Sequence, residues 1–169
     1  GVVVVGDAVE PEVDAAAEIG GQFNIAKQVP GKEEFFETLR YFGKQIALTG
    51  VTLKLNHRVA AQELVDAGFQ HVVLATGVTP RTPDIPGIDH PKVLPYIDAI
   101  LGRKPIGRRV AIMGAGGIGF DVAELVTHEG ISGAVDIGVF AREWGIDFEN
   151  HPRGGVTGVL PQVTKADRE

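Results

Sequence analysis

Six consecutive residues, Gly114-Ala-Gly-Gly-Ile-Gly119, have the spacing G-x-G-x-x-G that is typical of a phosphate-binding turn. They follow an expected strand at 109–113, which is apolar from residue 110 onward, and precede a segment with helical character. Gly114 permits the tight turn, and the missing side chain of Gly116 lets the backbone approach a pyrophosphate. Free N–H groups at the helix start attract phosphate, and Gly119 permits close packing of helix on strand. The motif therefore predicts dinucleotide binding by Gly114, Gly116, Gly117 and Gly119; the alternative is a turn that only packs.

Two stretches nearer the N-terminus also suit a bound cofactor. Glu18-Ile-Gly-Gly-Gln22 combines an acid, a glycine pair and an amide, which suit the ribose and flavin side of a cofactor, although this is also a common turn. Val72–Gly77 is an apolar run that ends in Ala-Thr-Gly, where the backbone can approach a ligand closely. The alternative for this second stretch is a buried strand that ends in a turn, and the residues alone leave both open.

The remaining reactive side chains form no catalytic or metal-binding pattern. The sequence has 5 histidines without i, i+4 spacing and 0 cysteines, so it holds no disulfide or cysteine-bound cluster, and we expect no metal site. No Ser–His–Asp arrangement or carboxylate pair stands out, and we predict no catalytic residue. Asp136 lies 17 residues after Gly119 (119 to 136), near the distance expected for an acid that binds a ribose hydroxyl. The alternative for Asp136 is a solvated loop aspartate.

Strands and helices alternate along the sequence. Apolar β-branched runs predict strands, some of them buried on both faces, and apolar residues at helical spacing predict helices. The expected strands are Val2–Val5, Val51–Leu55, His71–Ala75 and Arg109–Met113, with a further candidate at 135–140. The expected helices are Lys32–Thr49, 61–67, Tyr96–Leu101 and 117–129. This order predicts an α/β fold with mostly parallel sheets.

A proline-rich stretch divides the chain. Residues 79–91 hold 4 prolines in 13 positions, a density that excludes regular structure and is typical of a stiff linker. We therefore expect one partial domain at 1–80, a linker and crossover at 81–107, and a second partial domain at 108–169.

The composition is that of a soluble globular protein, with 44% hydrophobic and 22% charged residues. The net charge of −6 and the absence of a basic stripe argue against a nucleic-acid partner. No apolar run approaches the roughly 20 residues that span a bilayer, so we expect no membrane partner. The lack of cysteine fits a cytoplasmic protein. Because the chain starts inside an apolar run without an initiator Met, we expect a fragment whose partner is the rest of a longer polypeptide.

Several stretches together resemble the bacterial NADPH-dependent 2,4-dienoyl-CoA reductases, which are related to trimethylamine dehydrogenase and 2-enoate reductase. The resemblance covers about residues 14–158, and Ile19–Phe35 is its most specific part. The stretches are Glu18–Phe35, Thr38–Tyr41, Thr49–His57, Pro83–Val93, Gly114–Asp121 and Trp144–Asp147.

The resemblance implies a multi-cofactor parent enzyme in unsaturated fatty acid β-oxidation. In that family a barrel with FMN and a 4Fe–4S cluster comes first, and glutathione-reductase-like FAD and NAD(P) domains of Rossmann type follow. Hydride passes from NADPH to FAD, and electrons then reach FMN, which reduces the dienoyl thioester. Residues 1–80 and 108–169 would then be incomplete FAD- and NAD(P)-binding domains, and the isolated chain would be inactive. The alternative is a dinucleotide-binding module of a related amine dehydrogenase or 2-enoate reductase, with no turnover of its own.

The family's cofactor contacts transfer to named positions of this sequence. Asp14 falls where an acid would hold the adenosine ribose of FAD. The other FAD contacts fall on Gln22, Lys32, Val59, Ala75, Thr76 and Gly77. The nicotinamide cofactor falls on Gly114, Gly116, Gly117 and Gly119.

The sequence also departs from the family pattern. No G-x-G-x-x-G occurs before Asp14, and Glu10-Pro11-Glu12 interrupts the strand expected there. We therefore expect the FAD pyrophosphate site to be missing or damaged, and FAD to bind weakly. The resemblance makes 131–160 an insert, which removes Asp136 from the ribose site, and Trp144 is expected to pack within this insert.

Overall fold

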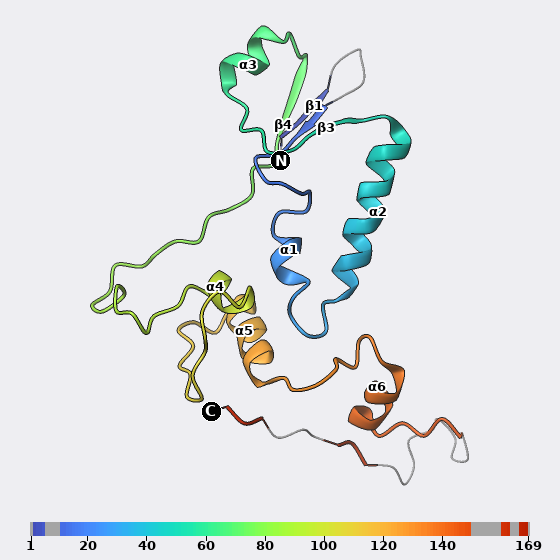
Figure 1. The fold of residues 1–169 in the computed structure, drawn as a ribbon, viewed down its shortest axis with the longest axis vertical. Coiled ribbons are helices and arrows are strands. Elements are labelled where there is room, and N and C mark those ends of the chain that lie inside the picture. Colours follow the sequence, from blue (N-terminus) through green and yellow to red (C-terminus); the bar gives the residue numbers. More distant parts are fainter. Residues whose placement is uncertain (1, 6–10, 150–159, 163–165, 169) are drawn as a thin grey trace. The chain divides into compact units, whose positions relative to one another are not determined.

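The chain is described in a computed structural model that covers residues 2–5, 11–149, 160–162 and 166–168 (Figure 1). It separates into two compact units. The first unit comprises Gly1–Asn24 and Phe35–Ile88, and the second comprises Ile25–Glu34 and Asp89–Glu169. The predicted division by cofactor stays a prediction, because these units are defined by packing alone.

The first unit holds a four-stranded sheet in the order β3-β2-β1-β4. Its strands are β1 (Val2–Val5), β2 (Pro11–Val13), β3 (Thr52–Lys54) and β4 (His71–Leu74). Strands β2 and β3 pair in parallel, and β1 is antiparallel to both β2 and β4. Three strands therefore run in one direction, as expected for a mostly parallel sheet, and β1 runs against them.

The direction of β1 follows from the length of its connection to β2. Only residues 6–10 separate the two strands, whereas a parallel connection needs a dozen or more residues. The expectation that Glu10-Pro11-Glu12 interrupts a strand is wrong, because β2 begins at Pro11. A proline is tolerated as the first residue of a strand, where its missing N–H costs little.

The apolar surface of the first unit is less covered than the sequence predicts. Helix α2 (Glu34–Thr49) forms where expected and ends before Gly50, whose φ of 74° is the left-handed conformation of a helix C-terminus. The aromatic residue Phe42 on this helix is 54% exposed. Strand β4 is an edge strand rather than one buried on both faces, and its Leu74 is 73% exposed. Helix α3 (Ala61–Asp66) connects β3 to β4, as predicted.

The second unit packs around α4 (Tyr96–Ile100) and α5 (Gly117–Thr127), which form where predicted. A short helix, α1 (Phe23–Ala26), begins in the first unit and ends within this unit's first segment. The buried cluster consists of Val29, Ile100, Val122 and Val126. The loop residue Val29 is only 1% exposed, so the segment 25–34 is part of this core rather than a surface loop.

Two strand predictions in the second unit are wrong. Residues 109–113 form no strand, and Met113 is 79% exposed. A strand needs a neighbour that accepts its N–H groups, and residues 89–149 contain no other strand. The candidate at 135–140 is instead occupied by helix α6 (Ile137–Trp144), which Asp136 caps by accepting a hydrogen bond from the Val139 N–H at 2.8 Å. Within the described residues, no helix is long and apolar enough to cross a membrane.

Candidate functional site

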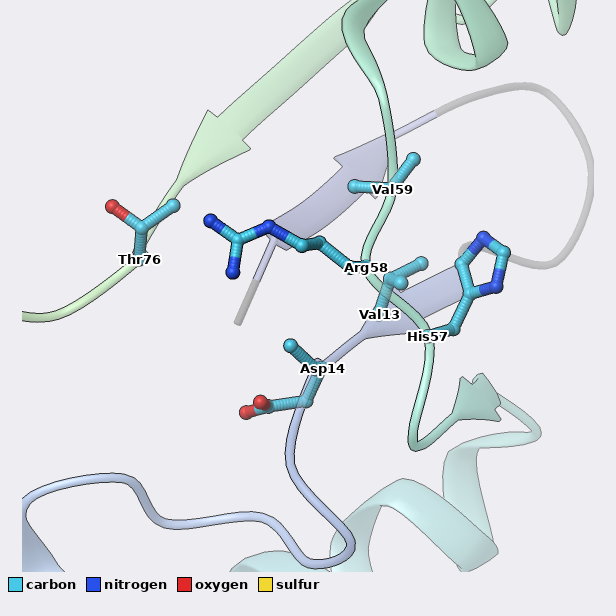
Figure 2. A pocket seen from close by; sticks show the side chains of 7 residues that line it. Val13, Asp14, His57, Arg58, Val59 and Thr76 are labelled. Carbon is cyan, nitrogen blue, oxygen red and sulfur yellow. The ribbon is translucent and has the colours of Figure 1, made fainter.

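A pocket lies where β2, β3 and β4 end (Figure 2). Because these three strands run in one direction, their carboxyl ends meet at one edge of the sheet, the place where α/β folds bind ligands. The lining residues are Val13, Asp14 and Ala15 after β2, His57, Arg58 and Val59 after β3, and Thr76 after β4. The structure thus brings together three of the predicted cofactor contacts, Asp14, Val59 and Thr76.

The size of the pocket fits part of a dinucleotide. Its volume is about 210 Å³. Pockets that enclose a whole small-molecule ligand measure about 300–1,000 Å³. The pocket therefore suits one nucleoside portion of a larger cofactor.

Backbone hydrogen bonds continue the β2–β3 pairing beyond the strands and place the two sides of the pocket. The Asp14 N–H donates to the Lys54 carbonyl at 2.9 Å, and the His57 N–H donates to the Asp14 carbonyl at 3.0 Å. Between them Asn56 takes a left-handed φ of 53° and donates its N–H to the Ala16 carbonyl at 2.8 Å. Residues 57–59 are therefore fixed beside the acid that is predicted to hold the ribose.

The pocket combines both signs of charge. One Asp14 carboxylate oxygen accepts the Ala16 N–H at 2.9 Å, which orients the side chain at the strand end. Figure 2 shows the Arg58 side chain extending across the pocket toward Thr76, with the Asp14 carboxylate on another side. The His57 Nε2 lies 2.7 Å from the Glu63 Oε1 on α3, which ties the loop to that helix. His57 and Arg58 were not predicted as site residues from the sequence, although they directly precede Val59.

The glycine pair before α1 lies close to the segment that follows β4. The Gln22 side-chain amide donates to the Val78 carbonyl at 3.3 Å. This bond joins two predicted contact regions, the turn at Gln22 and the Ala75–Gly77 segment. Gly77 has a left-handed φ of 74°, which lets the chain turn away from the strand at this point.

Lys32, the remaining predicted FAD contact, has its charge paired within the second unit. Its Nζ lies 2.6 and 2.7 Å from the two carboxylate oxygens of Asp121 on α5. The neighbouring Gly31 N–H donates to the Ser132 hydroxyl at 3.2 Å. The 25–34 segment is thus attached to α5 and to the loop after it, and the Lys32 ammonium reaches the helix that begins in the glycine turn.

The glycine turn has the conformation that its spacing predicts. Gly114 has a φ of 112°, and α5 begins at Gly117 with Gly116 as its N-cap. A side chain on Gly119 would collide with the Gly114 carbonyl oxygen, whereas a Cβ on Gly116 would have nothing within 4 Å. The first N–H groups of a helix have no acceptor within the helix. The space beside Gly116 and the first N–H groups of α5 would give a phosphate group both room and hydrogen bonds.

A second hollow of about 260 Å³ lies between the end of α5 and α6 and contains no predicted contact. The His128 Nδ1 is 3.8 Å from the Glu124 Oε1, and its Nε2 is buried without a hydrogen-bond partner. Phe140 and Trp144 form part of the wall, with ring centroids 6.0 Å apart. Trp144 therefore lies against another residue of the predicted insert, although its side chain is 65% exposed. The described residues contain no group of three or more His, Asp or Glu that suits a metal ion.

Comparison with known families identifies most of the chain. The model of the family described as pyridine nucleotide-disulphide oxidoreductase matches residues 8–136, which include the pocket and the glycine turn. A solved structure of 2-naphthoyl-CoA reductase in complex with 2-naphthoyl-CoA is similar over 78% of this chain and 21% of that protein. Its TM-score is 0.62 at 27% sequence identity. These findings confirm the predicted α/β class.

Characterised relatives are reductases with different substrates. A metal reductase from Desulforamulus reducens is 30% identical over 66% of this chain, and a cinnamate reductase from Clostridium sporogenes is 37% identical over 48%. A bilirubin reductase from Mediterraneibacter gnavus is 30% identical over 66%. The aligned parts make up only 17%, 12% and 18% of these relatives, so the chain spans a small part of their length.

Proposed function

The chain belongs to the pyridine nucleotide-disulphide oxidoreductase family, and we propose that it is part of the electron-input half of an NADPH-dependent 2,4-dienoyl-CoA reductase. The observation that carries this proposal is the pocket at the strand ends, which collects Asp14, Val59 and Thr76. All three are positions at which the resemblance places FAD. The first unit would hold the FAD adenosine, and the glycine turn of the second unit would hold NADPH.

Each part of the chain has a distinct task in this proposal. FAD, when bound, accepts hydride from NADPH and passes electrons onward. The Asp14 carboxylate accepts hydrogen bonds from ribose hydroxyls, and the chain at Val59 and Ala75–Gly77 closes around the nucleoside. At Gly116 the open backbone and the free N–H groups of α5 bind the NADPH pyrophosphate. No described residue is assigned a part in bond breaking, which belongs to the cofactors and the rest of the parent polypeptide.

The relatives support the proposed substrate class. The names of the cinnamate reductase and the 2-naphthoyl-CoA reductase indicate reduction of an unsaturated acid and of a CoA thioester. A dienoyl-CoA combines both features. The substrate site, FMN and the 4Fe–4S cluster would lie in the parent polypeptide outside this chain. We place the chain itself in the cytoplasm, a location that fits the 0 cysteines among its residues.

A second candidate is a dinucleotide-binding module of a related flavoprotein, such as an amine dehydrogenase or a 2-enoate reductase. The observation that favours it is the variety of substrates named among the relatives, which include metals and bilirubin. An input module that serves such different acceptors carries no information about the substrate. Under this reading the pocket and the glycine turn keep their roles, and only the parent reaction changes.

The experiment uses the parent polypeptide, purified with its cofactors. NADPH oxidation is followed with 2,4-dienoyl-CoA, cinnamate and trimethylamine as separate substrates. Turnover that depends on dienoyl-CoA supports the first candidate, and NADPH oxidation with cinnamate alone supports a 2-enoate reductase. Reduction of bound flavin by trimethylamine without NADPH would contradict the input role of both units.

A further inference from the structure

Arg58 is a cation with no partner beside the pocket. Among the described residues it makes no hydrogen bond or ion pair, unlike His57 before it, which is held by Glu63. Its backbone is nevertheless fixed, because the His57 N–H is bonded to the Asp14 carbonyl at 3.0 Å. A well-placed guanidinium without a carboxylate partner is available to an anionic ligand.

The ligand proposed for the pocket would present an anion to this cation. A dinucleotide brings a diphosphate with two negative charges, which Rossmann-type domains bind with a glycine-rich turn at a helix start. The ionisable side chains that line the pocket are Asp14, His57 and Arg58, and the Asp14 carboxylate repels a phosphate. Arg58 is the lining residue whose charge and planar fork suit phosphate oxygens.

We propose that Arg58 binds the diphosphate of the adenine dinucleotide whose adenosine occupies this pocket. The inference rests on the proposed function of the pocket and assigns a phosphate ligand that the family resemblance does not supply. Asp14 then accepts hydrogen bonds from an unphosphorylated ribose, because its negative charge disfavours a 2′-phosphate. The pair selects the ADP portion of FAD over that of NADPH.

Three probes separate this role from two others that an arginine has in nucleotide sites. Adenosine lacks phosphate, ADP carries the diphosphate, and adenosine 2′-monophosphate carries the phosphate that is specific to NADPH. A guanidinium that stacks on the adenine ring contributes to all three. A guanidinium that binds the diphosphate contributes only to ADP, and one that binds a 2′-phosphate only to the third probe.

The experiment measures the affinity of the purified chain for the three probes by isothermal titration calorimetry. The variants are Arg58→Ala, Arg58→Lys and the control Arg81→Ala, an exposed arginine of the first unit that does not line the pocket. We expect the native chain to prefer ADP over adenosine by about tenfold. This ratio corresponds to about 1.4 kcal/mol, which is close to the contribution of one charge-assisted hydrogen bond. Arg58→Ala should abolish the preference, Arg58→Lys should keep part of it, and Arg81→Ala should leave it unchanged. Added salt should weaken ADP binding more than adenosine binding.

The outcomes distinguish the inference from the function on which it rests. Equal weakening of adenosine and ADP in Arg58→Ala would assign the side chain to ring stacking and overturn the proposal. Weakening confined to adenosine 2′-monophosphate, or no change with any probe, would overturn it too. If the native chain binds none of the three probes while circular dichroism shows it folded, the nucleoside role of the pocket fails together with the inference.

Discussion

The two regions to which we assign nucleotide binding are built in opposite ways. The glycine turn is local, since the residues from Gly114 to Gly119 lie within one connection and the start of α5. The pocket of the first unit is assembled from three strand ends, and Asp14, Arg58 and Thr76 are 44 and 18 residues apart in sequence (14 to 58, 58 to 76). A local turn depends on a few backbone atoms, so one added side chain removes its function. In an assembled pocket several side chains each contribute to the binding free energy, so each single substitution lowers the ligand affinity less.

The first prediction concerns both regions together. With both nucleotide regions present, the isolated chain should still show no 2,4-dienoyl-CoA reduction, because it has 0 cysteines for a 4Fe–4S cluster and no assigned acid or base. The test is the NADPH-dependent loss of dienoyl-CoA absorbance with purified chain and added FMN and FAD. Turnover above that of a heat-denatured sample would show that the two regions suffice for the reaction.

The second prediction tests how tightly the assembled pocket of the isolated chain binds FAD. Without a glycine-rich turn before Asp14, the purified chain should be colourless or should lose FAD on desalting. Absorbance at the flavin maximum before and after a desalting column is the measurement, with the parent polypeptide as the positive control. A stable yellow chain with stoichiometric FAD would show that Arg58 and its neighbours replace the turn completely.

The third prediction tests the local site. Gly116→Val in the parent polypeptide should weaken NADPH binding by roughly a hundredfold or more, since two charge-assisted hydrogen bonds of about 1.5–3 kcal/mol each are lost. The fold should survive, because Gly116 has a φ of −82° and nothing within 4 Å of an added Cβ. The matched control is Gly107→Val, at a glycine that also has free space and no positive φ.

Normal NADPH affinity in Gly116→Val, measured by titration, would mean that the turn only packs. Weakening by Gly107→Val to the same extent would show a general effect of an added side chain. Circular dichroism of both variants checks that the fold is retained. These three measurements separate a binding turn from a structural one.

The same contrast explains which features the sequence predicted. Helices α2 and α5 and strands β3 and β4 follow from local periodicity and glycine positions, and the glycine turn follows from its own spacing. Arg58 has no such local signal, because the role that we propose for it depends on the pairing of β2 with β3. The strand expected at 109–113 fails for a related reason: a strand forms only beside a partner, which its own residues do not reveal.

The fourth prediction measures one side chain of the assembled pocket. Asp14→Asn should lower the affinity of the chain for ADP by about tenfold, because a ribose hydroxyl loses a charged acceptor. Asparagine keeps an oxygen that accepts the Ala16 N–H, so the strand end should stay in place. Equilibrium dialysis gives the affinity, and Asp84→Asn, at an exposed site outside the pocket, is the control. Unchanged ADP binding in Asp14→Asn would remove Asp14 from the ribose site.

The smallest expected effect belongs to Asp136, whose position after the glycine turn also suits a ribose ligand. In the structure it caps α6 instead, and such a cap contributes about 1 kcal/mol to stability. Asp136→Ala should therefore lower the free energy of unfolding by about this amount, a shift in melting temperature of roughly 2–4 °C, without any change in NADPH affinity.

Asp136→Ser separates the two roles of this residue, because serine caps a helix well but carries no negative charge. If Asp136 is a cap, Asp136→Ser should restore the melting temperature and bind NADPH like the native protein. If Asp136 holds the ribose, the serine variant should be stable and should still bind NADPH weakly. That second result would extend the local site from the glycine turn to the residue before α6, and the second nucleotide region would then also be assembled from distant segments.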